Sequence, residues 1–238
     1  MKIRKSLKEK KAIFFGETHG IRENLEILQK VIDENKDILQ TLILEFPIEH
    51  ESELNNYILG RKRSINWLKW NFKISADGRL SKEFFQFLHW LREVNMKQKN
   101  KIMIACVDIF GEKHINSKPN QRDKWMGENI RKEMNKLKKD KKAVGILGEF
   151  HARKEVFDKK RIPALYQLRN DKVVSIRLIY RSGTCFNIGL REVKKSRIKK
   201  EGIIKTRAKG FDYALVVKKA SPITPLGKFN SKDLIIEV

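Results

Sequence analysis

Two short apolar runs, far apart in this chain, end in the same pattern of glycine, glutamate, one spacer residue and histidine. Residues 12–15 precede Gly16-Glu17-Thr18-His19, and residues 143–147 precede Gly148-Glu149-Phe150-His151. The chain has only five histidines, so chance does not easily explain two such copies. Functional side chains of an open α/β sheet gather where parallel strands end. We therefore expect both strand ends to face one cleft.

Two further apolar runs between these copies also end in an acid. Residues 41–47 read as a buried strand that carries Glu45 near its end, and residues 102–107 read as a strand followed by Asp108. Segments with helical periodicity separate the strands, at residues 21–35 and 121–137. The strands at 12–15 and 41–47, with helix 21–35 between them, predict a parallel βαβ unit. The expected fold is α/β, with a central, mostly parallel sheet flanked by helices.

The rest of the chain fits one domain. At 238 residues the chain is long enough for a large single domain spanning 1–238. Residues 48–98 read as a helical insert that covers the cleft, and residues 193–209 as a basic excursion without regular structure. Later segments predict a short helix at 163–169, a rigid turn at 221–226, and strands. The expected strands are at 173–180, 184–188, 211–217 and 234–238.

Cysteine content and hydropathy indicate a reducing compartment. Cys106 and Cys185 fall in different predicted strands and form neither a disulfide framework nor a thiolate metal site. The apolar run at 12–15 is too short for the core of a signal peptide, and no stretch is long enough to span a membrane. We therefore expect a soluble, cytoplasmic protein.

The formal net charge of +24 raises the question of a polyanionic partner. The excess of lysine and arginine is spread over several helices and loops, and it accompanies no recognisable nucleic-acid-binding pattern. Binding to nucleic acid is therefore an alternative that the sequence does not favour. A small-molecule or peptide substrate is the favoured partner.

The clustered acids and histidines predict hydrolysis by an activated water molecule. We expect His19 to be the general base, oriented by Glu45 or Glu17, with His151 as a second acid–base group. Arg122 starts a predicted helix, where a cation is unfavourable, and it would stabilise an oxyanion. Neither Ser182 nor Cys185 lies in a nucleophile-elbow context. The remaining acids of these strand ends and of this helix start would line the substrate site; they are Asp108, Asp123 and Glu149.

The same side chains could instead hold a divalent metal ion. Two histidines with carboxylates suit manganese, iron or zinc, and a metal would lower the pKa of its bound water. Alternate residues of an extended chain point the same way, so Glu17 and His19 can converge. The metal set would be Glu17, His19, Glu45 and His151. Metal-dependent and metal-free hydrolysis both remain open from the residues alone.

Five motifs, taken in order, resemble the erythromycin esterase / ChaN-like / Tiki–TraB superfamily. They are Gly16-Glu17-Thr18-His19-Gly20, the strand ending in Glu45, Val107-Asp108 before Gly111, Arg122-Asp123-x-x-Met126, and Gly148-x-x-His151. The late segments Phe211-Asp212-Tyr213-Ala214 and Ser221-Pro222-Ile223-Thr224-Pro225 resemble the closing part of the erythromycin-esterase-like branch.

This resemblance implies an α/β fold with a cleft lined by both Glu/His strand ends, Glu45 and the Arg122-Asp123 helix start. It also implies a choice of activities. The esterase branch opens macrolactone esters through a histidine that activates water, the Tiki branch comprises metal-dependent peptidases, and ChaN-like members bind haem. Haem binding is therefore a further alternative. Its axial ligands would come from the histidines and from Tyr57, Tyr166 or Tyr180.

Overall fold

A seven-stranded sheet forms the centre of the computed structural model, which describes residues 9–65, 77–109, 120–158, 160–206 and 210–226. The strand order is β3-β2-β4-β1-β5-β9-β8. All neighbouring strands are parallel except β8, which is antiparallel to β9. The strands are β1 (Ala12–Glu17), β2 (Leu39–Pro47), β3 (Met103–Asp108), β4 (Lys142–Gly148), β5 (Val173–Tyr180), β8 (Gly202–Lys205) and β9 (Tyr213–Val217). A mostly parallel sheet is thus confirmed.

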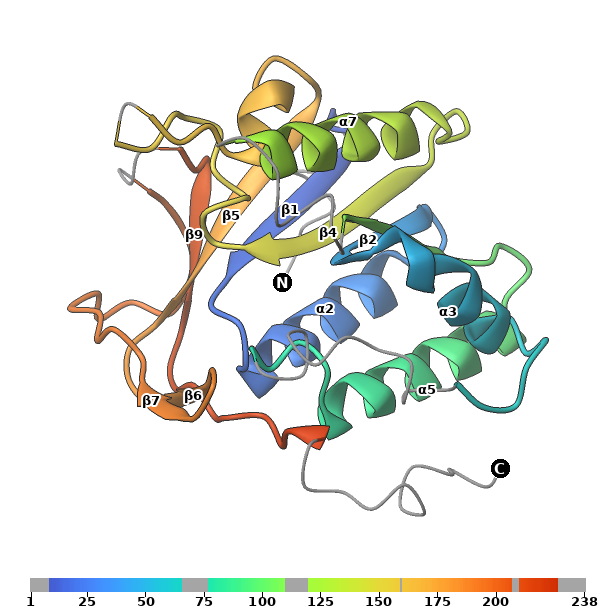
Figure 1. Cartoon of the computed structure of the whole chain (residues 1–238), viewed down its shortest axis with the longest axis horizontal. Coiled ribbons are helices and arrows are strands. Elements are labelled where there is room, and N and C mark those ends of the chain that lie inside the picture. The colour runs from blue at the N-terminus through green and yellow to red at the C-terminus, as the bar shows by residue number, and fades with distance from the viewer. Residues whose placement is uncertain (1–8, 66–76, 110–119, 159, 207–209, 227–238) are drawn as a thin grey trace.

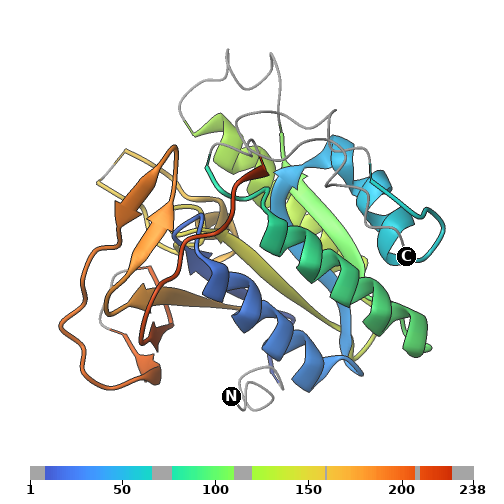
Figure 2. The same cartoon turned by 90° about the horizontal axis from the view of Figure 1, so that it is seen from below.

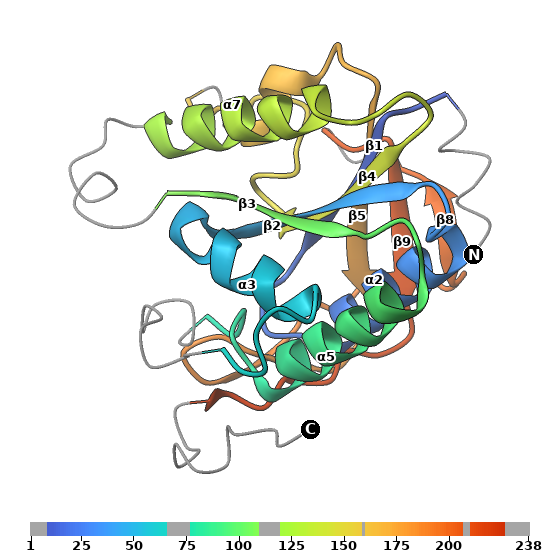
Figure 3. The same cartoon turned by 90° about the vertical axis from the view of Figure 1, so that its right-hand side faces the viewer.

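Helices cover both faces of the sheet (Figure 1). One face carries α2 (Arg22–Asn35), α3 (Glu51–Ile58) and α5 (Lys82–Lys97), which lie on the same side in Figures 2 and 3. The other face carries α7 (Gln121–Asn135) and the short helix η3 (Ala164–Leu168). A short helix η1 (Ile48–His50) links β2 to α3, and the hairpin of β6 (Thr184–Phe186) and β7 (Leu190–Glu192) lies outside the main sheet.

Side-chain alternation in the strands explains why the sheet needs cover on both faces. In β1, Ile13 and Phe15 pack in the cluster with α2 and α5, whereas Phe14 packs in the cluster with α7. In β2, Leu44 packs in the cluster with α2 and α5, and Ile43 packs in the cluster with α7. Because successive strand residues point to opposite faces, a continuous apolar run can be buried only between two layers of helices.

The main elements predicted from the sequence are present, with two differences. The βαβ pair is not adjacent, because β4 pairs with both β1 and β2 and separates them. The basic excursion at 193–209 contains the edge strand β8, which has the sequence Gly-Ile-Ile-Lys and pairs with β9. The predicted insert includes η1, α3 and α5. Several predicted features lie outside the described residues. They are Trp67 and Trp70 of the insert, Gly111 of the third motif, and the expected strand 234–238.

Residues 221–226, which we call the strap, cross the start of α2 and of α5. Antiparallel bridges join Ile21 to Pro222 and Ser81 to Pro225. The strap carbonyls of Ser221 and Thr224 accept hydrogen bonds from the first backbone amides of α2 and α5. The strap thereby satisfies amide groups that a helix start leaves without partners.

In the described part of the chain, no helix has the length and apolar character needed to cross a membrane.

Replacing Ser81 by alanine should destabilise the fold by about 1 kcal/mol. The Ser81 hydroxyl is fully buried and accepts a hydrogen bond of 3.2 Å from the backbone amide of Phe84, so it caps α5. Urea unfolding followed by circular dichroism measures the change. The control is Ser64→Ala at an exposed position, which should alter the unfolding free energy by less than about 0.5 kcal/mol. Equal stability of the two variants would contradict the capping role.

Candidate active site

The parallel register brings the predicted site residues to one edge of the sheet. Glu17 of β1 lies opposite Gly148 of β4, so the turns that carry His19 and His151 start side by side. On the other side of β4, the end of β2 supplies Glu45, whose carboxylate accepts a 2.6 Å hydrogen bond from the Gly148 amide. A side chain at position 148 would stand about 3.1 Å from His19 Nε2, so glycine allows this close approach.

His19 is held by a carboxylate from its own turn. Its Nδ1 lies 2.8 Å from Glu17 Oε1. The other Glu17 oxygen accepts a hydrogen bond from the side-chain amide of Asn24, whose carbonyl accepts one from the Tyr180 hydroxyl. Because Glu17 is an acceptor, His19 Nδ1 carries the proton and Nε2 carries the lone pair. Nε2 lies 3.9 Å from Glu45 Oε1, which is too long for a hydrogen bond.

His151 is held in the same manner by a residue from another element. Its Nδ1 lies 2.7 Å from Asp123 Oδ1, near the start of α7, and that oxygen also accepts from the Ala164 amide. Nδ1 is therefore the donor, and Nε2 accepts a 3.2 Å hydrogen bond from Arg122 Nη1. His151 Nε2 also lies 3.6 Å from Glu45 Oε1. Both imidazoles thus direct Nε2 toward one carboxylate oxygen.

Glu45 carries the charge at the centre of this arrangement, with only 3% of its side chain exposed. Its Oε1 accepts a 2.8 Å hydrogen bond from Arg122 Nη2 and lies 3.3 Å from Arg79 Nη1. Burial by itself would raise the pKa of Glu45, but the charges of His151, Arg79, His19 and Arg122 hold this pKa well below its usual range. Glu45 is therefore ionised at neutral pH.

Asp108 fixes Arg122 from the next strand, β3. Its two oxygens accept hydrogen bonds of 2.9 and 2.6 Å from Arg122 Nε and Nη2, and its side chain is fully buried. Asp108 and Asp123, expected to line the substrate site, therefore lie behind Arg122 and His151 and position them. Glu149, expected there as well, pairs with Arg177 at 2.9 Å and with Arg153 at 3.2 Å. The five catalytic residues that the sequence predicts do converge; they are Glu17, His19, Glu45, Arg122 and His151.

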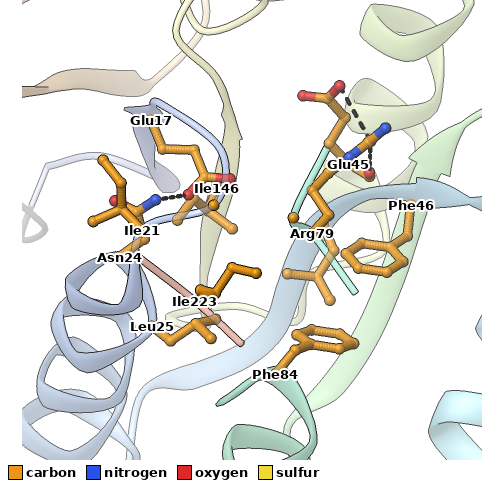
Figure 4. A pocket seen from close by; sticks show the side chains of 13 residues that line it. Glu17, Ile21, Asn24, Leu25, Glu45, Phe46, Arg79, Phe84, Ile146 and Ile223 are labelled. Atoms are coloured by element: carbon orange, nitrogen blue, oxygen red, sulfur yellow. Dashed lines mark hydrogen bonds and ion pairs between the residues drawn. The ribbon is translucent and has the colours of Figure 1, made fainter. Parts of the chain in front are cut away.

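Arg79 belongs to this site although the sequence indicated only a turn around it. Its Nη1 donates to the backbone carbonyl of Glu45 and approaches the carboxylate of Glu45 (Figure 4). Its Nη2 pairs with Asp77 at 2.7 Å. No sequence pattern marks Arg79, because it reaches Glu45 only when the chain folds back. Asn24 left a weak signal, since it is a polar residue on the same helical stripe as Leu28 and Val31.

The environment of His19 favours its protonated form more than water does. Burial alone would lower the pKa of His19, but its hydrogen bond with Glu17 and the charges of Glu45 and Glu17 raise it above the ordinary value. Burial also raises the pKa of Glu17. A cation at His19 would therefore be stabilised by two carboxylates. This is the property required of a group that takes up a proton during a reaction.

A metal ion does not fit the donor set expected from the sequence. Among the described residues, no group of three or more His, Cys, Asp or Glu side chains is arranged to hold one. The oxygens of Glu45 accept from Arg122, Arg79 and the Gly148 amide, and His151 Nε2 faces a guanidinium nitrogen. A metal cation at this position would be repelled by two guanidinium groups at close range. The arrangement is suited to chemistry in which arginine supplies the positive charge.

Haem ligation does not fit the tyrosines considered for it. Tyr180 is buried and donates to Asn24, and Tyr57 is buried with its hydroxyl 3.4 Å from His89 Nδ1. Tyr166 stacks under the guanidinium of Arg169, with 4.1 Å between the carbon of the guanidinium and the ring centre. The Nδ1 atoms of both site histidines are taken by carboxylates. A porphyrin would have to displace these packed groups.

Comparison with known proteins supports the fold. No protein-family model matches the sequence, and no curated protein is significantly similar to it. A solved succinoglycan biosynthesis protein matches with a TM-score of 0.71 and 11% identity, over 93% of this chain and 91% of that one. A mutant of the erythromycin esterase EreC in its open conformation matches with a TM-score of 0.65 and 9% identity, over 93% of both chains. A protein from Bacillus cereus matches with a TM-score of 0.63 and 13% identity, over 94% of this chain and 92% of that one.

These identities are low enough that the likeness concerns the fold alone. This chain has the fold of the erythromycin esterase, as the resemblance of its motifs predicts. A shared fold does not by itself assign a reaction, which must be argued from the side chains of the site.

Replacing Glu45 by glutamine should destabilise the fold by about 3–5 kcal/mol, because it leaves the guanidinium groups of buried Arg79 and partly buried Arg122 facing a neutral amide. The matched control is Glu93→Gln, which breaks an exposed ion pair with Lys97 and should cost less than about 0.5 kcal/mol. Urea unfolding at neutral pH measures both. Since folding lowers the pKa of Glu45, its contribution is present above the pKa of the unfolded chain and is lost as the pH falls through the folded pKa. The difference in unfolding free energy between wild type and Glu45→Gln should therefore become smaller in acid.

Proposed function

We propose that this protein is a hydrolase that cleaves a carboxylic ester or amide with a water molecule activated by His19. The observation that carries the proposal is the convergence of two carboxylate-held imidazoles on Glu45, with Nε2 to Oε1 distances of 3.9 and 3.6 Å, beside Arg122. A base, a group that orients it and a fixed positive charge are the parts that water-mediated acyl transfer requires.

In the first step, His19 Nε2 takes a proton from a water molecule while the water oxygen bonds to the carbonyl carbon. Glu17 keeps the imidazole in the tautomer with the lone pair on Nε2 and stabilises the imidazolium that forms. The electron pair displaced from the carbonyl double bond moves to the carbonyl oxygen. Arg122, with 23% of its side chain exposed against 6% for Arg79, is the guanidinium that a substrate oxygen can reach.

In the second step, the tetrahedral intermediate collapses and the bond from the carbonyl carbon to the leaving oxygen or nitrogen breaks. The leaving atom takes the bonding electron pair and receives the proton that His19 holds. The products are a carboxylic acid and an alcohol or amine. We assign His151 as the second acid–base group of the cleft.

Water is a better candidate for the nucleophile than either cysteine. Cys106 is buried, and burial raises the pKa of its thiol well above the ordinary value. Burial also raises the pKa of Cys185. A thiol must ionise to be an effective nucleophile, so both environments oppose that role. Small esters and amides are the substrates to test first.

Replacing His19 by asparagine should lower kcat for ester hydrolysis by at least about 100-fold, because the base is lost. His151→Asn should also lower kcat strongly. The measurement is release of p-nitrophenol from p-nitrophenyl esters by the full chain, in buffer that contains EDTA. The matched control is His89→Asn, which changes a histidine of α5 outside the cleft and should keep wild-type turnover. Wild-type turnover in a folded His19→Asn protein would refute the assignment.

The rate of hydrolysis should rise with pH through the pKa of His19, because only the neutral imidazole can accept a proton. Since folding raises this pKa, half-maximal kcat should lie above the ordinary histidine value. Glu17→Gln removes a carboxylate that raises the pKa of His19, so it should move the acid limb of the profile to lower pH while lowering the maximal rate. An acid limb that does not move in Glu17→Gln would show that another group controls the rate.

A further inference from the structure

An apolar pocket adjoins the candidate catalytic groups on the α2 and α5 side of the sheet (Figure 4). Glu17, Glu45 and Arg79 lie at one end of this pocket, and Leu25, Phe84 and Ile223 lie at the opposite end. His19 bridges the two carboxylates at the polar end, with its Nδ1 on Glu17 and its Nε2 toward Glu45. A group held in this pocket would therefore place its attachment point next to the proposed base.

The walls of the pocket favour hydrocarbon over water. Phe46 and Phe84 form a stacked pair, with ring centres 4.8 Å apart, and both side chains are buried. Water held in a cavity needs two to four polar partners, and these walls offer few away from the polar end. The apolar side chains that line the pocket are Ile21, Leu25, Leu44, Phe46, Phe84, Ile146 and Ile223.

The size of the pocket limits what it can hold. Its volume is about 40 Å³. A single water-sized group needs about 10–15 Å³ on this measure, so the pocket takes roughly three or four non-hydrogen atoms. A short aliphatic chain fits this limit, whereas a macrocycle or a long acyl chain does not.

The strap holds Ile223 in a defined position. The Ile223 amide donates to the Gly20 carbonyl at 3.2 Å. On one side, Ser221 binds α2 through Glu23, whose carboxylate accepts from the Ser221 amide at 2.8 Å. On the other side, Thr224 donates from its amide and its hydroxyl to Glu83 of α5, at 2.8 and 2.9 Å. The Ile223 side chain is therefore a fixed wall, with 5% exposed.

We propose that this pocket binds the acyl group of the substrate and that Ile223 sets the length of the acyl chain. The substrate class is an ester or amide of an uncharged aliphatic acid with about two to four carbons. The acyl half is assigned here because the alcohol or amine must leave when the tetrahedral intermediate collapses, whereas the far end of the pocket is lined by buried Phe84 and Ile223 and by partly buried Leu25. A charged acyl group is disfavoured, since it would lose its hydration against the apolar walls of the pocket.

This inference rests on the proposed hydrolase function. Two measurements distinguish a failure of the pocket assignment from a failure of the hydrolase function. The first is kcat/KM of the full chain for p-nitrophenyl acetate, butyrate, hexanoate and octanoate. Wild type should prefer acetate and butyrate and should lose about tenfold or more at hexanoate. Ile223→Ala should raise the hexanoate to acetate ratio by about tenfold, and Ile223→Phe should lower the butyrate to acetate ratio.

Matched controls make the result specific. Leu190→Ala removes the same kind of aliphatic side chain at a position that is 71% exposed and outside the pocket, and it should leave all ratios unchanged. Ile223→Val should shift the ratio in the same direction as Ile223→Ala by a smaller factor, and it keeps the test valid if the alanine variant does not fold. Unchanged acyl-chain ratios in folded Ile223→Ala and Ile223→Val, with hydrolysis intact, would overturn the pocket assignment and leave the hydrolase function standing.

The second measurement is the binding of acetamide, butyramide and hexanamide to the full chain. Nuclear magnetic resonance detects this binding, which does not depend on catalysis. Binding of butyramide that Ile223→Phe abolishes and Leu190→Ala preserves would support the pocket even if no ester were cleaved. In that case only the hydrolase function would fail. Absence of butyramide binding in wild type would overturn the pocket assignment.

Discussion

The buried charge of Glu45 is the constraint on which the rest of the site depends. A carboxylate with 3% of its side chain exposed has lost nearly all of its hydration and must recover that free energy from neighbouring groups. Arg122, Arg79 and the Gly148 amide supply this compensation. These partners come from α7, from the turn before α5 and from β4, so one charge ties together three distant parts of the chain.

That requirement explains several features at the edge of the sheet. Arg122 is itself held in place by Asp108, and Arg79 by Asp77, so each cation that serves Glu45 has a second anion behind it. Each of the two histidines has its Nδ1 on a carboxylate. A network in which cations and anions alternate keeps both imidazoles oriented. Such preorganisation is what electrostatic catalysis relies on.

The two faces of the sheet contribute different groups to the proposed reaction. The α7 face supplies Arg122 and the Asp123–His151 pair, which handle charge and protons. The α2 and α5 face supplies the apolar pocket, closed by Ile223 of the strap. Gly20 is central to this second half, because its carbonyl binds both Ile223 and Phe186, and a side chain at position 20 would collide with the Phe186 carbonyl. The glycine that follows His19 therefore serves the wall of the pocket as well as the turn.

The sequence by itself determined the layered α/β fold and five converging residues of the site. Periodicity marks the buried strands and their helices, and acid-bearing strand ends of a parallel sheet must meet at one edge. Only the tertiary structure decided the rest. It placed β4 between β1 and β2, turned Glu149 toward Arg153 and Arg177, and brought Arg79 onto Glu45. The reason is that strand order, ion-pair partners and pocket walls depend on contacts between segments far apart in the chain, whereas periodicity reports only on neighbours.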